Sequence, residues 1–133
     1  MRVLVDTSVW SLAFRRDNPG NIPAVTVLGR LLEQNGLVVI TGIILQELLQ
    51  GFSGPRDRRL IIEKLSSLPL LVPDLDDHIH AAELRNRCRR KGIQVGTIDA
   101  LIARLAIAHD CSLLTTDKDF QSIAAITELR LVN

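Results

Sequence analysis

The sequence contains little cysteine, few aromatic residues and no long apolar run. Its two cysteines, Cys88 and Cys111, provide neither a disulfide framework nor the ligand spacing of a zinc site, so we expect a reducing, cytoplasmic setting. With no tyrosine, one tryptophan and three phenylalanines, the core must rest on Leu, Ile, Val and Ala. No apolar run approaches the roughly 18 residues of a membrane helix. The opening Val3–Val5, followed by Asp6, does not resemble a signal peptide. We therefore expect a soluble protein that has no part in a membrane.

The overall charge is also small, although the basic residues are unevenly distributed. The formal net charge is +1, which by itself does not indicate a nucleic-acid-binding protein. Basic residues gather at 56–59 and at 85–91. The second cluster could follow a nucleic-acid backbone, or it could be the solvated face of a helix, and the sequence leaves both possibilities open.

Short apolar segments alternate with helical segments along the chain. Apolar runs predict strands at 3–5, 37–40, 70–72, 112–115 and 129–132. Helical spacing predicts helices at 24–34, 43–52, 56–65, 76–91, 97–109 and 118–124, with a turn at 17–21. The length fits one domain over residues 1–133. This alternation predicts an α/β fold with a mainly parallel sheet, whose sites lie beyond the carboxyl ends of the strands.

Two aspartates lie just beyond the ends of predicted strands. Asp6 comes after Val3–Val5, and Asp117 comes shortly after the strand predicted at 112–115. Simpler explanations exist, because Asp6 could cap a following helix and Asp117, with Asp119, could form a turn. If the strands are parallel, however, both carboxylates lie at the edge of the sheet where such folds bind ligands.

Two further acids lie in predicted apolar helices. Glu47 interrupts the aliphatic segment 43–49, where it could instead be an exposed residue or half of a buried ion pair. Asp99 lies in the first turn of the most apolar predicted helix, where Thr97 could act as the cap and the helix dipole favours an acid. A buried carboxylate costs several kcal/mol unless a partner compensates for it, and no basic residue is nearby in the sequence.

Four converging carboxylates predict a site for a divalent metal ion. Such a cluster repels itself strongly at low dielectric unless a cation neutralises it. Ligand sets made only of oxygen select hard ions such as Mg²⁺ or Mn²⁺. An ion of this kind retains water molecules, so it can bind a phosphate oxygen and also present a nucleophile. The pattern therefore indicates phosphodiester hydrolysis that uses neither histidine nor cysteine.

The ordered motifs resemble a known family. The segment 3–10, which contains Asp6, resembles the opening of PIN-domain proteins and, more narrowly, of the VapC toxins of bacterial toxin–antitoxin pairs. The segments 45–51, 99–103 and 114–120 are similar to the second, third and fourth motifs of that family. The resemblance covers the chain from end to end. It implies a PIN-like three-layer α/β/α sandwich and a Mg²⁺-dependent endoribonuclease in which Mn²⁺ can substitute.

The resemblance also implies a role for particular residues. The catalytic, metal-binding acids would be Asp6, Glu47, Asp99 and Asp117. The residues that hydrogen-bond these ligands or their waters would be Thr7, Ser8, Thr116 and Asp119. Because Asp119 lies two residues beyond Asp117, either of them could face the metal, and the resemblance favours Asp117.

Substrate and partners follow from the same resemblance. It implies cleavage of structured cellular RNA, such as tRNA or rRNA loops, leaving a 3′-hydroxyl and a 5′-phosphate. A cognate VapB-type antitoxin would occupy the active-site groove, with an Arg or Lys reaching the carboxylates. The toxin would form a homodimer, and no nucleotide cofactor is expected.

Other small α/β proteins fit the sequence less well. A response-regulator receiver would place an acidic pair after the first strand, whereas Asp6 is followed by Thr7. A haloacid-dehalogenase-type phosphatase needs a second acid at the position of Ser8, and a P-loop nucleotide binder needs a Gly-rich motif that is missing. A catalytically silent PIN-like binding module would have lost one or more acids, and this chain retains all four.

Overall fold

The computed structural model describes residues 1–15, 17 and 20–132, which contain a five-stranded sheet. Its strands are β1 (Val3–Val5), β2 (Val38–Thr41), β3 (Leu70–Leu71), β4 (Ser112–Leu114) and β5 (Arg130–Leu131). The order across the sheet is β3-β2-β1-β4-β5, and every neighbouring pair is parallel. The predicted α/β fold with a parallel sheet is confirmed.

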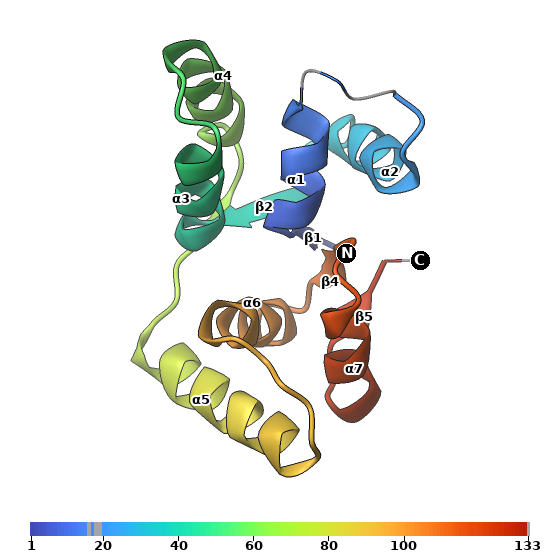
Figure 1. Ribbon diagram of the computed structural model, residues 1–133, viewed down its shortest axis with the longest axis vertical. Coiled ribbons are helices and arrows are strands. Elements are labelled where there is room, and N and C mark those ends of the chain that lie inside the picture. Colours follow the sequence, from blue (N-terminus) through green and yellow to red (C-terminus); the bar gives the residue numbers. More distant parts are fainter. Residues whose placement is uncertain (16, 18–19, 133) are drawn as a thin grey trace.

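Seven helices in the described part of the chain cover the sheet. On one face lie α1 (Thr7–Phe14), α2 (Pro23–Leu32), α3 (Gly42–Gly51) and α4 (Pro55–Leu65); on the other lie α5 (Leu75–Arg90), α6 (Thr97–Ala108) and α7 (Asp119–Ile126) (Figure 1). This arrangement gives the expected three layers. The turn predicted at 17–21 includes residues 18 and 19, which lie outside the described residues. No helix that the structure describes is long and apolar enough to cross a membrane.

The three central strands are apolar because helices cover both of their faces. Every residue of β1, β2 and β4 is buried, and Leu4, Val39 and Leu113 are fully inaccessible. The edge strands β3 and β5 are shorter than the strands predicted at 70–72 and 129–132, and each contains one exposed residue. Short edge strands present few unpaired backbone groups to another chain.

The sheet has one point where the direction of its strand order reverses. From β1, the strands β2 and β3 extend to one side, and β4 and β5 extend to the other. In open parallel sheets, ligands bind outside the carboxyl ends of the strands at such a switch point. The register pairs Val5 with Leu114, so the segments that follow β1 and β4 begin side by side.

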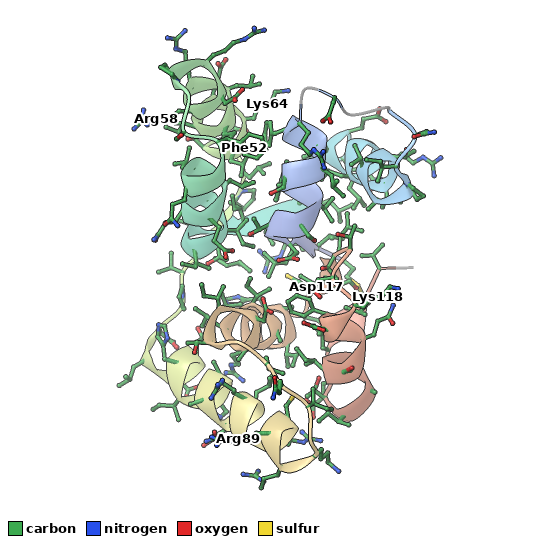
Figure 2. All side chains as sticks on the ribbon, in the orientation of Figure 1. Phe52, Arg58, Lys64, Arg89, Asp117 and Lys118 are labelled. Carbon is green, nitrogen blue, oxygen red and sulfur yellow. The ribbon has the colours of Figure 1, made fainter. Side chains whose placement is uncertain are left out.

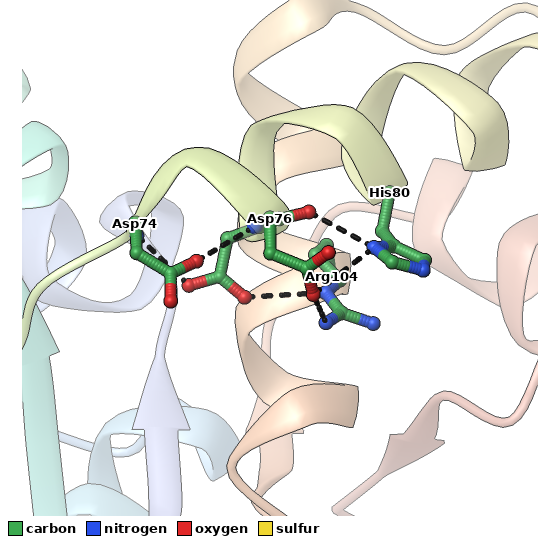
Figure 3. Close-up of polar contacts among 5 residues, drawn as sticks. Asp74, Asp76, His80 and Arg104 are labelled. Atoms are coloured by element: carbon green, nitrogen blue, oxygen red, sulfur yellow. Dashed lines mark hydrogen bonds and ion pairs between the residues drawn. The ribbon is translucent and has the colours of Figure 1, made fainter.

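A polar clamp fixes α5 against α6 (Figure 3). Asp74 and Asp77 cap α5 reciprocally, each carboxylate accepting a hydrogen bond from the backbone N–H of the other residue at 3.0 Å or less. From α6, Arg104 donates through Nε to Asp77 Oδ1 at 3.2 Å and lies 3.4 Å from the carboxylate of Asp76, which also contacts His80. Burial opposes the charge on Asp77, but the hydrogen bonds from Asp74 and Arg104 prevail and lower the pKa of this carboxyl. The clamp thereby positions α6.

Candidate active site

Asp6 lies at the switch point, directly after β1. It takes the N-cap position of α1, but its side chain is held from elsewhere: Oδ2 accepts hydrogen bonds from Ser8 Oγ at 2.8 Å and from Thr115 Oγ1 at 2.9 Å. The residue is 6% exposed. The structure therefore favours a carboxylate oriented at the edge of the sheet over a helix-capping aspartate.

The segment after β4 is tied to the segment after β1 by the same hydroxyls. Thr115 Oγ1 accepts a hydrogen bond from the backbone N–H of Asp117 at 3.0 Å, and Ser8 Oγ accepts one from the N–H of Thr116 at 3.1 Å. In turn, Asp117 Oδ1 accepts the N–H of Asp119 at 2.9 Å. This network holds the half-buried Asp117 beside the end of β1.

Thr115 is a site residue that the sequence pattern does not indicate. The pattern predicts a strand over 112–115, whereas β4 ends at Leu114 and Thr115 begins the loop. Thr116, the threonine that was expected to hydrogen-bond a ligand, is exposed and contributes its backbone N–H to Ser8. A Ser or Thr that lies between the end of a strand and an acid is the signal that identifies a residue such as Thr115.

Glu47 reaches the site from α3. Its side chain is half-buried, and its Oε1 accepts a hydrogen bond of 2.7 Å from Thr7 Oγ1 at the start of α1. Within the part of the chain that the structure describes, Glu47 forms no ion pair. It is thus neither a fully exposed helix residue nor half of a buried ion pair.

Asp99 lies half-buried in the first turn of α6. The alternative in which Thr97 caps this helix does not hold, because Gly96 takes the N-cap position and Thr97 is already the first helical residue. The pKa of Asp99 is raised from 3.8 to about 6, first by burial and then by neighbouring negative charges. Those charges belong, in decreasing order of effect, to Asp6, Asp117, Glu47 and Asp119.

The structure thus brings all four predicted acids together. Glu47 and Asp99 come from helices on opposite faces of the sheet, while Asp6 and Asp117 follow adjacent strands (Figure 1). Asp119 is exposed at their margin. Among the described residues, no group of three or more His, Cys, Asp or Glu side chains is gathered closely enough to hold a metal ion as it stands.

The chemistry of these side chains nevertheless fits a hard divalent cation. The side-chain atoms that could coordinate a metal ion here are carboxylate and hydroxyl oxygens. Mg²⁺ and Mn²⁺ prefer such oxygens to nitrogen or sulfur. Burial is the largest cause of the raised pKa of Asp99, and the negative charges of the neighbouring acids raise it further. A cation among the four acids would remove this repulsion.

Comparison with known proteins places this fold and site in a defined class. The family model of the PIN domain matches residues 3–126. The solved structure of VapBC2 from Rickettsia felis, bound to a promoter DNA fragment, superposes with a TM-score of 0.75 at 27% identity and covers 100% of this chain and 98% of that one. VapC20 of Mycobacterium tuberculosis gives a TM-score of 0.67 at 20% identity, covers 96% and 98%, and shows the fold alone.

Curated relatives narrow the assignment. Ribonuclease VapC11 of Mycobacterium tuberculosis is 36% identical over 130 residues, which are 96% of each chain. Ribonuclease VapC2 of Rickettsia felis is 33% identical over 98 residues, covering 70% of this chain and 73% of the relative. The chain therefore belongs to the PIN-domain family and, within it, to the VapC group, as the sequence motifs suggested.

Proposed function

We propose that this protein is a metal-dependent endoribonuclease and the toxin of a VapBC-type toxin–antitoxin pair. The observation that carries the proposal is the convergence of Asp6, Glu47, Asp99 and Asp117 at the switch point of a parallel sheet. The curated relatives are named as ribonucleases, which supports the same activity. We also propose that residues 1–133 form one domain, which is supported by the core cluster that the described strands and helices share.

Mg²⁺ is the proposed cofactor, and Mn²⁺ is expected to substitute. Asp6 and Asp99 would hold the ion, and Glu47 and Asp117 would complete the cluster. When bound, the ion supplies an activated water and draws charge from the scissile phosphate. Asp117 is preferred to Asp119 because it is less exposed and has the larger effect on Asp99.

The remaining residues of the site orient these acids. Ser8 and Thr115 both donate to Oδ2 of Asp6, which fixes the plane of that carboxylate. Thr7 donates a hydrogen bond to the carboxylate of Glu47, and the backbone N–H of Asp119 donates one to the carboxylate of Asp117. Both bonds orient the acid that accepts them. Hydrogen bonds of this kind keep ligands in position, and their loss typically costs about 10–100-fold in metal affinity or activity.

The proposed substrate is structured cellular RNA, in particular tRNA or rRNA loops. The proposed partner is a VapB-type antitoxin, supported by the likeness to VapBC2 of Rickettsia felis, a solved toxin–antitoxin pair. We further propose that the toxin is a cytoplasmic homodimer. The two buried cysteines, Cys88 and Cys111, are free and agree with a reducing compartment.

Cleavage of a total-RNA pool by antitoxin-free protein tests the activity. The protein is assayed with Mg²⁺, Mn²⁺ or EDTA, beside the variants Asp99→Asn and Asp110→Asn. Asp110 is a matched control, since it lies just beyond the other end of α6 and its positive φ of 53° is tolerated by Asn. We expect discrete, metal-dependent fragments from the wild type and from Asp110→Asn. Equal cleavage by Asp99→Asn would contradict the proposal.

A further inference from the structure

A cleft of about 600 Å³ lies beside the acidic site. It is lined by Arg85 and Arg89 of α5, by Gln94 and Gly96 between α5 and α6, and by Asp119 of α7. One end lies near the acids, because Gly96 is the N-cap of the helix that carries Asp99 and the charge of Asp119 acts on Asp99. Pockets of about 300–1,000 Å³ hold small organic ligands, so the cleft can accept a nucleotide-sized group.

The two arginines form one positive wall of this cleft. Four residues apart on α5, Arg85 and Arg89 lie on the same helical face and about 6 Å apart along it. Arg85 Nε donates to the backbone oxygen of Val95 at 2.8 Å, which fixes its guanidinium against the α5–α6 connection. Arg89 is exposed (Figure 2). Within the described ranges, neither arginine forms an ion pair. Two guanidinium charges therefore remain available to an anion.

We propose that this cleft binds backbone phosphates of single-stranded RNA on one side of the bond that is cut. The inference rests on the proposed nuclease function. A polyanion that approaches four carboxylates needs positive charge nearby, and the planar guanidinium binds phosphate through two parallel hydrogen bonds. The arginines can serve successive phosphates, while Gln94 can hydrogen-bond the sugar or phosphate oxygens.

The lining also indicates which part of the RNA is recognised. None of the lining residues that the structure describes is aromatic, so the cleft offers no platform on which a base could stack. Phosphate contacts position a nucleic acid without reading its sequence. We therefore assign the cleft a role in positioning the substrate. The shape of the RNA then determines which strand can enter.

An acidic segment of a protein partner is the competing ligand. RNA is favoured because the cleft runs from the arginines to Asp119, whose charge acts on Asp99 among the four acids. A strand of phosphates can follow this path once a cation neutralises the acids, whereas an acidic peptide would meet like charges at the same end. The competing ligand is kept as an outcome of the test.

Arg89→Ala and Arg87→Ala form a matched pair for this test. Both residues are exposed on α5 and each substitution removes one positive charge, but Arg87 lines a different cleft, with His80 and Glu128. The probe is a short, fluorescein-labelled single-stranded RNA of mixed sequence. Its affinity is measured over a range of KCl concentrations with Ca²⁺ in place of Mg²⁺, so that a cation neutralises the intact acids while cleavage is suppressed.

We expect Arg89→Ala to weaken RNA binding about three- to tenfold and to reduce the slope of log K against log salt by about 0.7, the change for one phosphate contact. Arg89→Lys should keep the slope and lose part of the affinity, because it preserves the charge but not the guanidinium fork. Arg87→Ala should leave both unchanged. With Mg²⁺, Arg89→Ala should raise the KM of RNA cleavage and leave kcat unaltered.

Equal affinities and slopes for Arg89→Ala and Arg87→Ala would overturn the inference. So would intact RNA binding together with weakened binding of a Glu-rich peptide, which would assign the cleft to a protein partner. Either result leaves the nuclease proposal standing if the wild type cuts RNA and Asp99→Asn does not. If neither protein cuts RNA with any metal, the nuclease proposal fails, while the binding data still decide what the cleft binds.

Discussion

The orientation of Asp6 depends on a hydroxyl that cannot be chosen from the sequence. Thr115 and Thr116 are adjacent and chemically equal, but Thr115 donates to Asp6 while Thr116 is exposed. Successive residues of an extended chain point in opposite directions, so the choice depends on the residue at which β4 ends. The acids themselves could be predicted, because carboxylates beside apolar strands and inside apolar helices are costly without a function.

The two threonines give the first prediction. Thr115→Val removes the hydroxyl that orients Asp6 and accepts the N–H of Asp117, with little change in shape. We expect RNA cleavage to fall about 10–100-fold, as for other residues that orient metal ligands. Thr116→Val is the control, because the backbone N–H that bonds Ser8 remains, and it should retain near-wild-type activity. Equal losses in both variants, measured as kcat/KM, would contradict this role for Thr115.

The raised pKa of Asp99 predicts a pH-dependent stability in the metal-free protein. In the folded state Asp99 keeps its proton up to a pH of about 6, whereas in the unfolded chain it ionises near 3.8. The folded state therefore binds more protons between these values, and stability falls as the pH rises through this window. Asp99→Asn removes this loss and should be more stable than the wild type by about 1–2 kcal/mol near neutral pH.

Denaturant unfolding in EDTA measures this difference. Near pH 4 the wild type and Asp99→Asn should have similar free energies of unfolding, because Asp99 is then protonated in the folded state. The two curves should separate as the pH rises. A wild type that is at least as stable as Asp99→Asn at neutral pH would show that burial and the neighbouring acids do not raise the pKa of Asp99 as described.

At the scale of elements, α6 carries Asp99 to the edge of the sheet and α5 holds it there. The sequence predicted both helices to within a residue or two, and it predicted that α6 is buried. It could not predict their clamp, because Arg104 and Asp77 are 27 residues apart and both look like ordinary surface charges. Asp77 is in fact 6% exposed. Pairing between distant helices follows from packing, which local patterns do not encode.

Removal of the clamp should destabilise the fold. Arg104→Met leaves the carboxylate of Asp77 buried without its positive partner, and we expect a loss of about 2 kcal/mol in the free energy of unfolding at neutral pH. Arg104 and Asp74 hold the pKa of Asp77 below its usual value, so their contribution is present above the unfolded pKa of that group. It is lost as the pH falls through the folded pKa, so the effect of Arg104→Met should shrink in acid.

An exposed ion pair provides the comparison for this clamp. Arg130 pairs with Asp110 on the surface, where side chains are 48% and 87% exposed, respectively. Exposed pairs typically contribute about 0–1 kcal/mol, so Arg130→Ala should change stability little. If Arg104→Met and Arg130→Ala have equal effects in urea unfolding, the clamp does not fix α5 against α6.

At the scale of the whole molecule, strand order creates the site. Asp6 and Asp117 meet because β1 and β4 are neighbours, although more than a hundred residues separate them in the chain. Glu47 and Asp99 meet although α3 and α6 cover opposite faces (Figure 1). The sequence predicted that parallel strands would bring acids to one edge, but it did not contain the order of the strands. That order depends on tertiary contacts. Periodicity predicts the strands and helices alone, whereas the resemblance of the motifs to a known family assigned the four acids to one site.

The central claim is that these four acids bind a divalent cation that RNA cleavage requires. Calorimetric titration of Mn²⁺ into the wild type, Asp99→Asn and Asp110→Asn, with cleavage assayed on the same samples, tests it most directly. We predict that the wild type and Asp110→Asn bind Mn²⁺ and that cleavage saturates over the same concentrations, while Asp99→Asn loses both. Undiminished Mn²⁺ binding and RNA cleavage by Asp99→Asn would contradict the claim.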